Sequence, residues 1–412
     1  MKACIALATT LVLILGFSTL AADNSGRIYG KLTTVDGEVF EGLIRWDKNE
    51  VYWLDVLDGT KDLDDRYGQR DERRERRKTR IEIFGITIGD ESSSHWNWSS
   101  SAQSGVRFGH IRTLEVIDDQ EALIELKSGE TVRLTQGSTD LGEDIREIIV
   151  EDDDEGQIGL VWDDIERIEF SQADNDQRSV FGERLYGTLV TRRGDEFTGW
   201  VCWDIDEVFA TDVLDGEEKR RKRKIKFGKI AAIERYSSNG ATVYLDNGED
   251  ILLRGTNDVD DGNRGIIISD PGFGQVRIDW DEFERLDFKT APRAPRYADF
   301  DGGRRLYGTV YTEEGDKYTG YVRWDDDESY SWELIDGDNR DIEFDIELGL
   351  IEEIRKRSYR SSIVTVHDGR EFRLRGSNDV DEDNKGIFIE LDDGDIIEVD
   401  WEEFVRVEFT RP

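Results

Sequence analysis

Two loops of the chain carry oxygen-bearing side chains at alternate positions, which is the pattern that could hold a metal ion. One loop spans residues 255–265 and the other spans residues 376–386. Their aspartates are Asp258, Asp260, Asp379, Asp381 and Asp383. Hard cations such as Ca²⁺ prefer several oxygen ligands contributed by a short loop. Calcium is therefore the one cofactor that the sequence suggests, with these five residues as candidate ligands.

A structural interpretation of the same loops stands beside the calcium hypothesis. Aspartate and asparagine side chains accept hydrogen bonds from their own backbone and so close turns without any metal. The spacing also departs from that of an EF-hand, because Asn384 stands where the invariant glycine is expected and no helix is expected on either side. The sequence favours a loop that orders a strand connection and keeps calcium as the alternative.

Three tryptophans are candidates for contact with a ligand or partner. Trp96 and Trp98 lie in a serine-rich stretch within an insertion near residues 60–106, where they either fold back on the protein or touch a partner. Trp200 alternates with Trp203, so the two side chains point to opposite faces of a strand. We expect Trp203 to be in the core and Trp200 to be the more accessible of the two.

Residues for nucleophilic catalysis are few and scattered. The three histidines are His95, His110 and His367, and no Ser-His-Asp or Cys-His arrangement is visible. Cys202 stands where two other segments have arginine, which predicts a partly exposed strand face. We therefore expect a protein that is not an enzyme. The enzyme alternative is a carboxylate-dependent glycan hydrolase, which needs two carboxylates in one cleft.

An internal repeat must position all of these residues. Residues 184–288 and 305–409 align without insertion at an offset of 121, and residues 27–170 form a longer third copy. Each copy opens with Tyr-Gly, contains Trp-Asp-x-x-Glu and ends in an aromatic and acidic phrase closed by phenylalanine. Such self-similarity predicts three tandem structural units.

Each unit reads as a series of short strands. Apolar and polar residues alternate in short runs, and pairs such as Asn247-Gly248 mark hairpin turns. The strands expected in the second unit are 184–192, 195–204, 207–213, 224–235, 241–246, 249–254, 265–269, 275–280 and 283–288. The fold class is thus all-β, with about nine strands per unit. Small SH3-like or Sm-like barrels in pairs, or one barrel or sandwich per unit, fit that number.

The first 22 residues resemble a secretory signal peptide. Lys2 precedes an apolar run, and small residues at positions 21 and 22 fit a cleavage site. We expect an exported protein, periplasmic or extracellular, with no membrane span after cleavage. Cys202 would then be the single remaining cysteine, so core packing rather than a disulfide must stabilise the units.

The charge of the chain limits its partners. Its 94 acidic and 55 basic residues give a formal net charge of −39, which disfavours nucleic acid. Basic runs at 66–80 and 219–226 are expected to be solvated loops that decorate single units. The sequence therefore predicts a secreted, non-enzymatic module that is structural or binds protein or envelope polysaccharide. A calcium-stabilised binding module is the second hypothesis.

Overall fold

The structure is a computed structural model that describes residues 24–62, 101–135, 139–174, 177 and 179–410. Over these residues the protein is all-β, with antiparallel strands and only single-turn 3₁₀ helices. The 3₁₀ helices are η1 (Phe108–His110), η2 (Gly142–Asp144), η3 (Trp162–Asp164), η4 (Phe227–Lys229), η5 (Asn257–Val259), η6 (Tyr297–Asp299) and η7 (Leu348–Leu350). Within the same ranges, no helix has the length and apolar character needed to cross a bilayer.

The first unit contains ten described strands in one sheet. They are β1 (Tyr29–Thr34), β2 (Val39–Arg45), β3 (Val56–Asp62), β4 (Ser101–Arg107), β5 (Ile111–Asp118), β6 (Glu121–Leu126), β7 (Thr131–Thr135), β8 (Ile148–Asp152), β9 (Gly156–Leu160) and β10 (Ile165–Phe170). Their order in the sheet is β4-β3-β7-β6-β5-β10-β1-β2-β8-β9. The first and last strands of the unit, β1 and β10, are therefore neighbours in its middle.

The second unit contributes ten strands and the third unit another ten. Those of the second are β11 (Tyr186–Thr191), β12 (Glu196–Cys202), β13 (Val213–Glu218), β14 (Arg221–Lys226), β15 (Ile230–Ser237), β16 (Gly240–Leu245), β17 (Asp250–Leu253), β18 (Ile266–Asp270), β19 (Gly274–Ile278) and β20 (Phe283–Phe288). Those of the third are β21 (Tyr307–Thr312), β22 (Lys317–Arg323), β23 (Leu334–Asn339), β24 (Ile342–Glu347), β25 (Ile351–Ser358), β26 (Ser361–Val366), β27 (Glu371–Leu374), β28 (Ile387–Glu390), β29 (Ile396–Val399) and β30 (Phe404–Phe409). The strand order in the sheet of the second unit is β17-β16-β15-β20-β11-β12-β18-β19. The equivalent strands of the third unit follow the same order, β27-β26-β25-β30-β21-β22-β28-β29.

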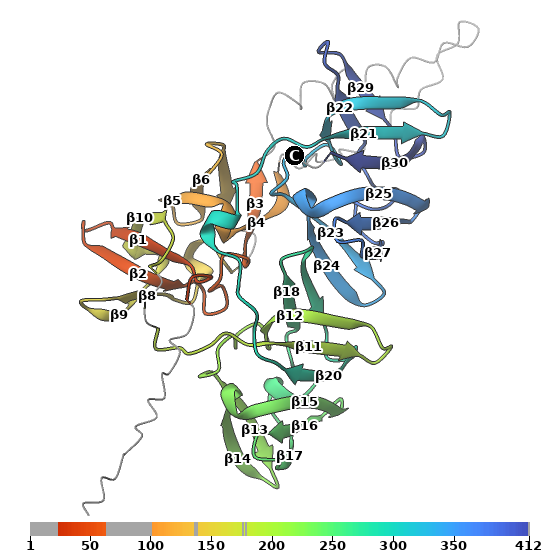
Figure 1. Ribbon diagram of the computed structural model, residues 1–412. Coiled ribbons are helices and arrows are strands. Elements are labelled where there is room, and N and C mark those ends of the chain that lie inside the picture. The colour runs from red at the N-terminus through yellow and green to blue at the C-terminus, as the bar shows by residue number, and fades with distance from the viewer. Residues whose placement is uncertain (1–23, 63–100, 136–138, 175–176, 178, 411–412) are drawn as a thin grey trace, which may run out of the picture.

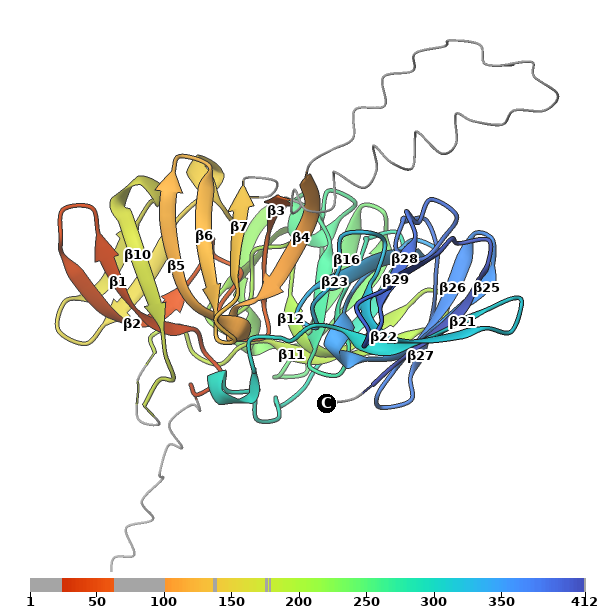
Figure 2. The same cartoon turned by 90° about the horizontal axis from the view of Figure 1, so that it is seen from above.

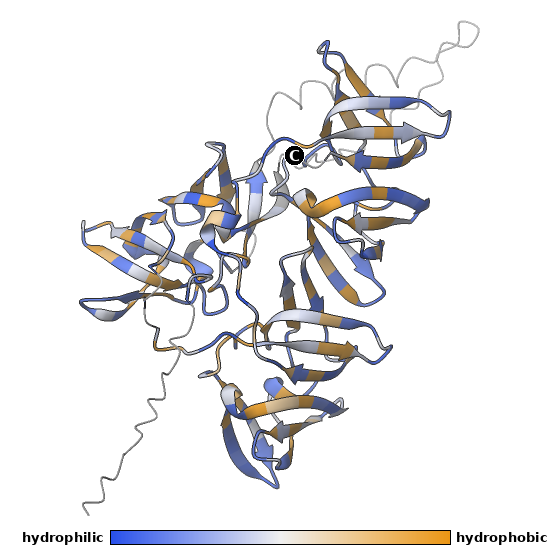
Figure 3. Ribbon diagram, in the orientation of Figure 1, coloured by the Kyte–Doolittle hydropathy of each residue, from blue (hydrophilic) through white to orange (hydrophobic). Residues whose placement is uncertain are grey.

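Alternation of apolar and polar residues explains the strands. In β6, Ala122, Ile124 and Leu126 are fully buried while the residues between them are partly exposed. The same banding of hydrophobic and hydrophilic residues runs along most strands (Figure 3). At the β16–β17 turn, Gly248 has a φ of +84°, a conformation that glycine adopts without the steric cost of a Cβ.

The structure differs from the expected strands at three places in the second unit. The expected strand 224–235 is divided by η4 into the end of β14 and the start of β15. Residues 207–212 form isolated bridges and turns instead of a strand, because their backbone wraps around the side chain of Asp212. The basic run 219–226 is not a loop but the turn and outer strand of the β13–β14 hairpin. The described sheets are open, and no closed barrel occurs among them, unlike the small barrels that the strand number suggested.

The second and third units share one sheet. Strand β19 pairs antiparallel with β24, so eight strands of the second unit continue into the β23–β24 hairpin of the third. Figure 1 shows the two units joined through this hairpin, with the first unit beside them. Apolar residues of both units form a single buried cluster that runs across the junction.

The first unit packs against the other two, as the view from above shows (Figure 2). Its apolar cluster includes Trp200, Cys202 and Phe209 of the second unit and Trp332 of the third. Trp200 is 2% exposed and packs beside Tyr52, so the expectation that it is accessible is wrong. Cys202 is also buried, because the first unit covers the strand face that carries it. Neither burial was visible from alternation within one strand.

Candidate functional site

Three loops of the form Trp-Asp-x-x-Glu each bring two carboxyl groups next to an aspartate from a distant loop. The resulting sets are Asp47, Glu50 and Asp140 in the first unit, Asp204, Glu207 and Asp258 in the second, and Asp325, Glu328 and Asp379 in the third. We call these sets the acidic triads. They recur at equivalent positions in all three units, and we therefore treat them as the candidate site.

An indole anchors the distant aspartate in every triad. The Nε1–H groups of Trp46, Trp203 and Trp324 donate to the backbone oxygens of Asp140, Asp258 and Asp379, each at 2.9 Å. The three indoles are completely buried. The tryptophan expected in the core is therefore in the core, and it also fixes the loop that supplies the third carboxyl group of the triad.

A tight turn places the first carboxyl group. In the second unit Asp204 and Ile205 have φ values of +51° and +55°, and such values are costly for a β-branched residue. The carboxylate of Asp204 accepts hydrogen bonds from the backbone N–H of Arg264 at 2.6 Å and from its Nη2 at 3.0 Å. Asn257 donates to the same carboxylate. These bonds hold the strained turn against the Asn-Asp loop.

The distant aspartate also caps the start of a hairpin. The Oδ2 of Asp258 accepts from the N–H of Asp215 in β13 at 2.6 Å, and the Oδ2 of Asp379 accepts from the N–H of Asp336 in β23 at 2.8 Å. One oxygen of each carboxyl group is thus committed to backbone.

The glutamates are the unusual members of the triads. The Oε2 atoms of Glu50, Glu207 and Glu328 are buried and have no hydrogen-bond partner among the described residues. Burial, and then repulsion from Asp258 and neighbouring aspartates, raises the pKa of Glu207 to about 9. Burial and nearby carboxylates likewise raise the pKa of Glu50 and Glu328 well above its ordinary value. With a pKa of about 9, Glu207 holds a proton at neutral pH.

The third triad has the geometry closest to that of a metal site. Ligand atoms of Asp325, Glu328 and Asp379 all lie within 4.8 Å of one another. Hard cations would accept such oxygen ligands. Two lysines already supply positive charge there, since the Nζ of Lys385 lies 3.5 Å from Asp325 and the Nζ of Lys61 lies 3.9 Å from Glu328. The triad can therefore bind a proton, an ammonium group or a metal cation.

The structure divides the aspartates that the sequence suggested as metal ligands. Asp258 and Asp379 belong to triads. Asp260 and Asp381 instead accept hydrogen bonds from backbone N–H groups two residues ahead, at 3.0 and 3.1 Å, which is the turn-closing role. Asp383 is exposed on the loop. Trp96 and Trp98 lie outside the described residues.

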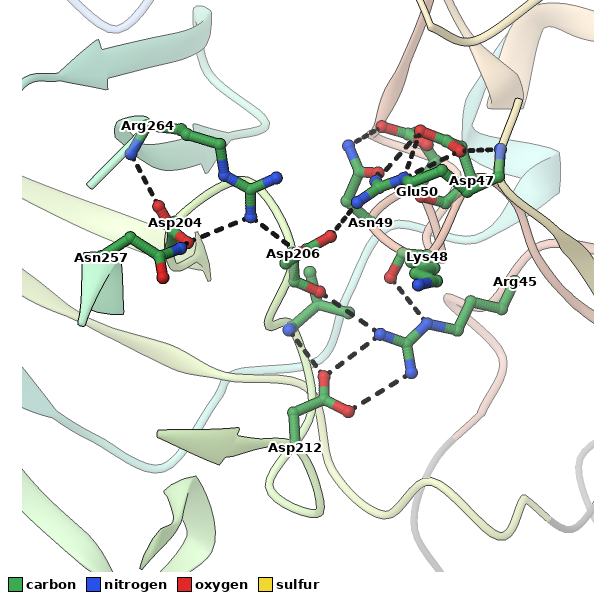
Figure 4. Close-up of polar contacts among 12 residues, drawn as sticks. Arg45, Asp47, Lys48, Asn49, Glu50, Asp204, Asp206, Asp212, Asn257 and Arg264 are labelled. Carbon is green, nitrogen blue, oxygen red and sulfur yellow. Dashed lines mark hydrogen bonds and ion pairs between the residues drawn. The ribbon is translucent and has the colours of Figure 1, made fainter. Parts of the chain in front are cut away.

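The triads of the first and second units meet across a charged interface (Figure 4). Arg146 binds Asp47 at 3.0 Å and also Asp206, while Arg264 binds Asp204 at 3.0 Å and Asp206 at 2.7 Å. Asp206 thus lies between two arginines from different units. The loops that carry the triads are therefore also the loops that join the units.

A lysine connects the first unit to the third triad. The Nζ of Lys61 donates to Glu333 at 2.6 Å and to the backbone oxygen of Asp327 at 2.7 Å. Burial alone would lower the pKa of Lys61, but the carboxylates of Glu333 and Glu328 outweigh it and raise the pKa above its ordinary value. This ammonium group is charged at any physiological pH and is sealed between units.

A cavity of about 490 Å³ opens where the first unit, the 289–304 linker and η7 meet. Arg107 and His110 line it and face Glu347, at 3.3 and 3.4 Å respectively. Arg293, Arg296 and Arg304 line it as well, together with Asp299 and Asp301, so its wall carries charges of both signs. The sequence did not indicate this cavity, since its lining residues come from five separate segments.

The chain was compared with protein-family models, with curated proteins and with solved structures, and none of the three comparisons found a match.

Proposed function

We propose that this protein is an exported, non-enzymatic β-repeat protein, periplasmic or extracellular, that acts as a structural or interaction module. One observation carries the proposal: the motifs common to the three units are used inside the fold. The tryptophan and the first aspartate of each Trp-Asp-x-x-Glu loop are buried, and both hold a neighbouring loop or strand in place. The role of these shared residues is therefore to hold the fold of each unit together.

The three units are proposed to be copies of one ancestral module related to small β-barrels. Strands of the second and third units start at positions that differ by 121 for β11 and β21 and for β15 and β25. Their sheet orders correspond strand by strand. Duplication of a stable module builds an elongated body with a repeated surface, which suits a scaffold or a binder of repetitive partners.

Equivalent positions in different units can carry different side chains, and some of these positions contact a neighbouring unit in one copy and solvent in another. Trp200 of the second unit is buried against the first unit, whereas Tyr321 at the equivalent position in the third unit is 42% exposed. One strand position thus serves a contact in one unit and faces solvent in the next. The proposed partners are a protein or an envelope polysaccharide that binds such solvent-facing positions.

The test of the non-enzymatic role is direct. Purified mature protein is incubated with envelope polysaccharides, and released reducing ends are measured for the wild type and for Glu207→Gln and Glu328→Gln. We expect no turnover above the buffer control with any of the three proteins. Hydrolysis by the wild type that disappears in one of the two variants would establish the carboxylate-dependent hydrolase instead.

A second candidate function is a calcium-stabilised module, favoured by the three carboxyl groups that converge in the third triad. It predicts that chelation lowers the melting temperature and that Asp325→Asn with Asp379→Asn removes this effect. Asp383→Asn is the matched control, because Asp383 lies on the same loop and outside the triad. A melting temperature that is unchanged by calcium and by chelator would eliminate this function.

A further inference from the structure

The junction between the second and third units shows how one unit accepts the next. Strand β19 pairs with β24 in a fixed register, in which Val276 lies opposite Phe344 and Arg277 lies opposite Glu343. Gly274 permits the close approach, since a Cβ at this position would meet the backbone oxygen of Asp345 at 2.0 Å. The junction is therefore backbone pairing between two sheet edges.

Four ion pairs border this junction. One joins Arg370 to Asp270 at 2.8 Å, and the positions 121 residues away, Glu249 and Leu391, do not form an opposite-charge pair. In the other three, Arg193 binds Asp341 at 3.3 Å, Arg340 approaches Asp195 at 3.7 Å, and Arg277 approaches Glu343 at 3.6 Å. Each pair joins a residue of the second unit to a residue of the third. Exposed pairs of this kind add little stability individually, but they select the partner and its register.

The strands equivalent to β19 and β24 in the other unit of the pair, β29 and β14, each have one free edge among the described strands. Strand β29 occupies in the third unit the place that β19 has in the second, and β28 is its one partner among the described strands. Strand β14 occupies in the second unit the place that β24 has in the third, and β13 is its one described partner. Figure 1 shows β14 and β29 at opposite ends of the joined second and third units.

The two edges are complementary in charge. A shift of 121 positions along the chain converts three of the four bordering ion pairs into Glu314 with Arg220, Asp316 with Lys219, and Glu398 with Lys222. Every converted pair joins an acid of the third unit to a base of the second, and all six residues are exposed. In two of the three the sign of each partner is reversed relative to the internal junction, so opposite charges still meet.

We propose that β29 of one copy pairs antiparallel with β14 of a second copy, in the register of the β19–β24 junction, to build head-to-tail assemblies. This inference rests on the proposed role as a structural or interaction module and names a second copy of the chain as the partner. The contact is between two different surfaces, so it leaves one free edge of each kind and continues from copy to copy. Exposed strand edges favour such pairing unless charge opposes it, and here the charges attract.

Apolar contact at the new junction is smaller than at the internal one. Arg223 replaces Phe344, which packs against three phenylalanines in the internal junction. Ile396 on β29 is 37% exposed and would become covered by the second copy. Because ion pairs then supply a larger share of the binding, the assembly is expected to weaken as salt rises.

Strand β9 of the first unit is the competing acidic edge. The residues equivalent to Arg193 and Asp195 are there Asp36 and Glu38, which also suit Lys219 and Arg220. Gly159, however, stands where Glu398 would face Lys222. The β29 edge therefore offers three complementary pairs and the β9 edge two, which decides between them.

Sedimentation velocity of the purified mature protein over a hundredfold concentration range, at low and high salt, tests the proposal. We expect assembly at low salt that is lost at high salt. Lys222→Glu and Glu398→Lys should each weaken assembly by about tenfold or more, since a like-charge pair replaces an attractive one. An equimolar mixture of the two variants should assemble again, because each supplies the edge that suits the other.

Glu352→Lys is the matched control, because Glu352 is exposed on β25 in the third unit, five strands away from β29 in the sheet. It should assemble like the wild type. A wild type that stays monomeric at low salt overturns the inference, as does a mixture of variants that fails to recover. Assembly abolished by Asp36→Lys but not by Glu398→Lys overturns it in favour of β9. A monomeric result leaves the proposed function intact, because an interaction module with another partner does not require self-assembly.

Discussion

Replacing Glu207 with glutamine should stabilise the protein at alkaline pH. The carboxyl group of Glu207 is largely buried beside Asp204 and Asp258, and its Oε2 has no hydrogen-bond partner among the described residues. Burial, followed by repulsion from these aspartates, raises its pKa from 4.5 to about 9. The folded protein therefore keeps a proton on Glu207 at pH values where the unfolded chain has lost it. Glutamine has nearly the same shape and never ionises.

The sign and size of the effect follow from this pKa. Below pH 4.5 Glu207 is protonated in both the folded and the unfolded protein, so its ionisation does not reduce the free energy of unfolding. As the pH rises from 4.5 toward 9, the unfolded chain loses the proton and the folded protein keeps it, so the free energy of unfolding falls. Each pH unit in this window costs about 1.4 kcal/mol, so the interval from pH 5 to pH 8 costs about 4 kcal/mol at most. Because the loop lies near the surface and water relaxes around it, we expect about 2 kcal/mol.

Urea unfolding at pH 5, 6, 7 and 8 in the presence of a chelator measures this effect. The wild type should lose stability across the series, and Glu207→Gln should lose about 2 kcal/mol less. Glu166→Gln is the control, since Glu166 is exposed on β10 and should leave the slope as in the wild type. Equal pH slopes for the wild type and Glu207→Gln would refute the reasoning.

The same experiment with calcium separates a proton from a metal at the triad. A bound cation stabilises the ionised carboxylate and so competes with the proton. If the second triad binds calcium, the stability of the wild type in calcium should rise with pH, and Glu207→Gln should remove that rise. If the proton is the resident species, calcium leaves the slope unchanged.

Two further substitutions probe how the units are held together. Trp200→Ala should destabilise the protein by about 3–5 kcal/mol because it empties a buried position between units, whereas Tyr321→Ala at the equivalent exposed position should change the free energy of unfolding by less than about 1 kcal/mol, both by urea unfolding. Lys61→Met should cost about 3–5 kcal/mol, since Glu333 and Glu328 would remain buried without their cation, and hydrogen exchange should show the loss concentrated where the first and third units meet. Equal losses for the two aromatic variants, or a neutral Lys61→Met, would contradict this account of the interfaces.

The strands of each unit were largely predictable, and the reason is local. The alternation of apolar and polar residues and the glycines of the turns both lie within a few residues of each strand. The observed bounds of β12, β16 and β20 are therefore close to the expected ones. The β13–β14 hairpin escaped prediction because Lys and Arg dominate β14 and provide no apolar alternation. Its pairing with β13 comes from the turn at Lys219 and Arg220, which both have positive φ.

Contacts between units were not predictable from any single segment. Burial of Trp200 depends on Tyr52, which lies about 150 positions earlier in the chain, and no pattern around Trp200 reveals that neighbour. Alternation with Trp203 suggested exposure, and comparison with the third unit, which has Tyr321 at the equivalent position, agrees with that expectation. That comparison failed because equivalent positions have different neighbours: the first unit covers the second unit here and leaves Tyr321 of the third exposed.

The acidic triads could have been found from the repeat itself. Trp-Asp-x-x-Glu occurs at 46–50, 203–207 and 324–328, but its aspartate and glutamate do not stand out by number among the 94 acidic residues of the chain. An acid that recurs at a fixed distance from a buried indole is itself constrained to be near the core. In an acidic protein, recurrence at equivalent positions is thus a better guide to buried carboxyl groups than local density.

The basic strand β14 is also unusual for its charge, since it lies in an acidic protein. A protein with a net charge of −39 gains solubility from its acids, so a strand with five basic residues among six is unfavourable unless it meets an acidic surface. Within the chain, acidic residues of β13 pair with part of this positive charge, since Lys224 lies 3.4 Å from Asp215 and Arg223 lies 3.5 Å from Glu218. The outer side of β14 is not matched in this way by any other described strand. An acidic edge on a second copy satisfies it with the register that the chain already uses once internally.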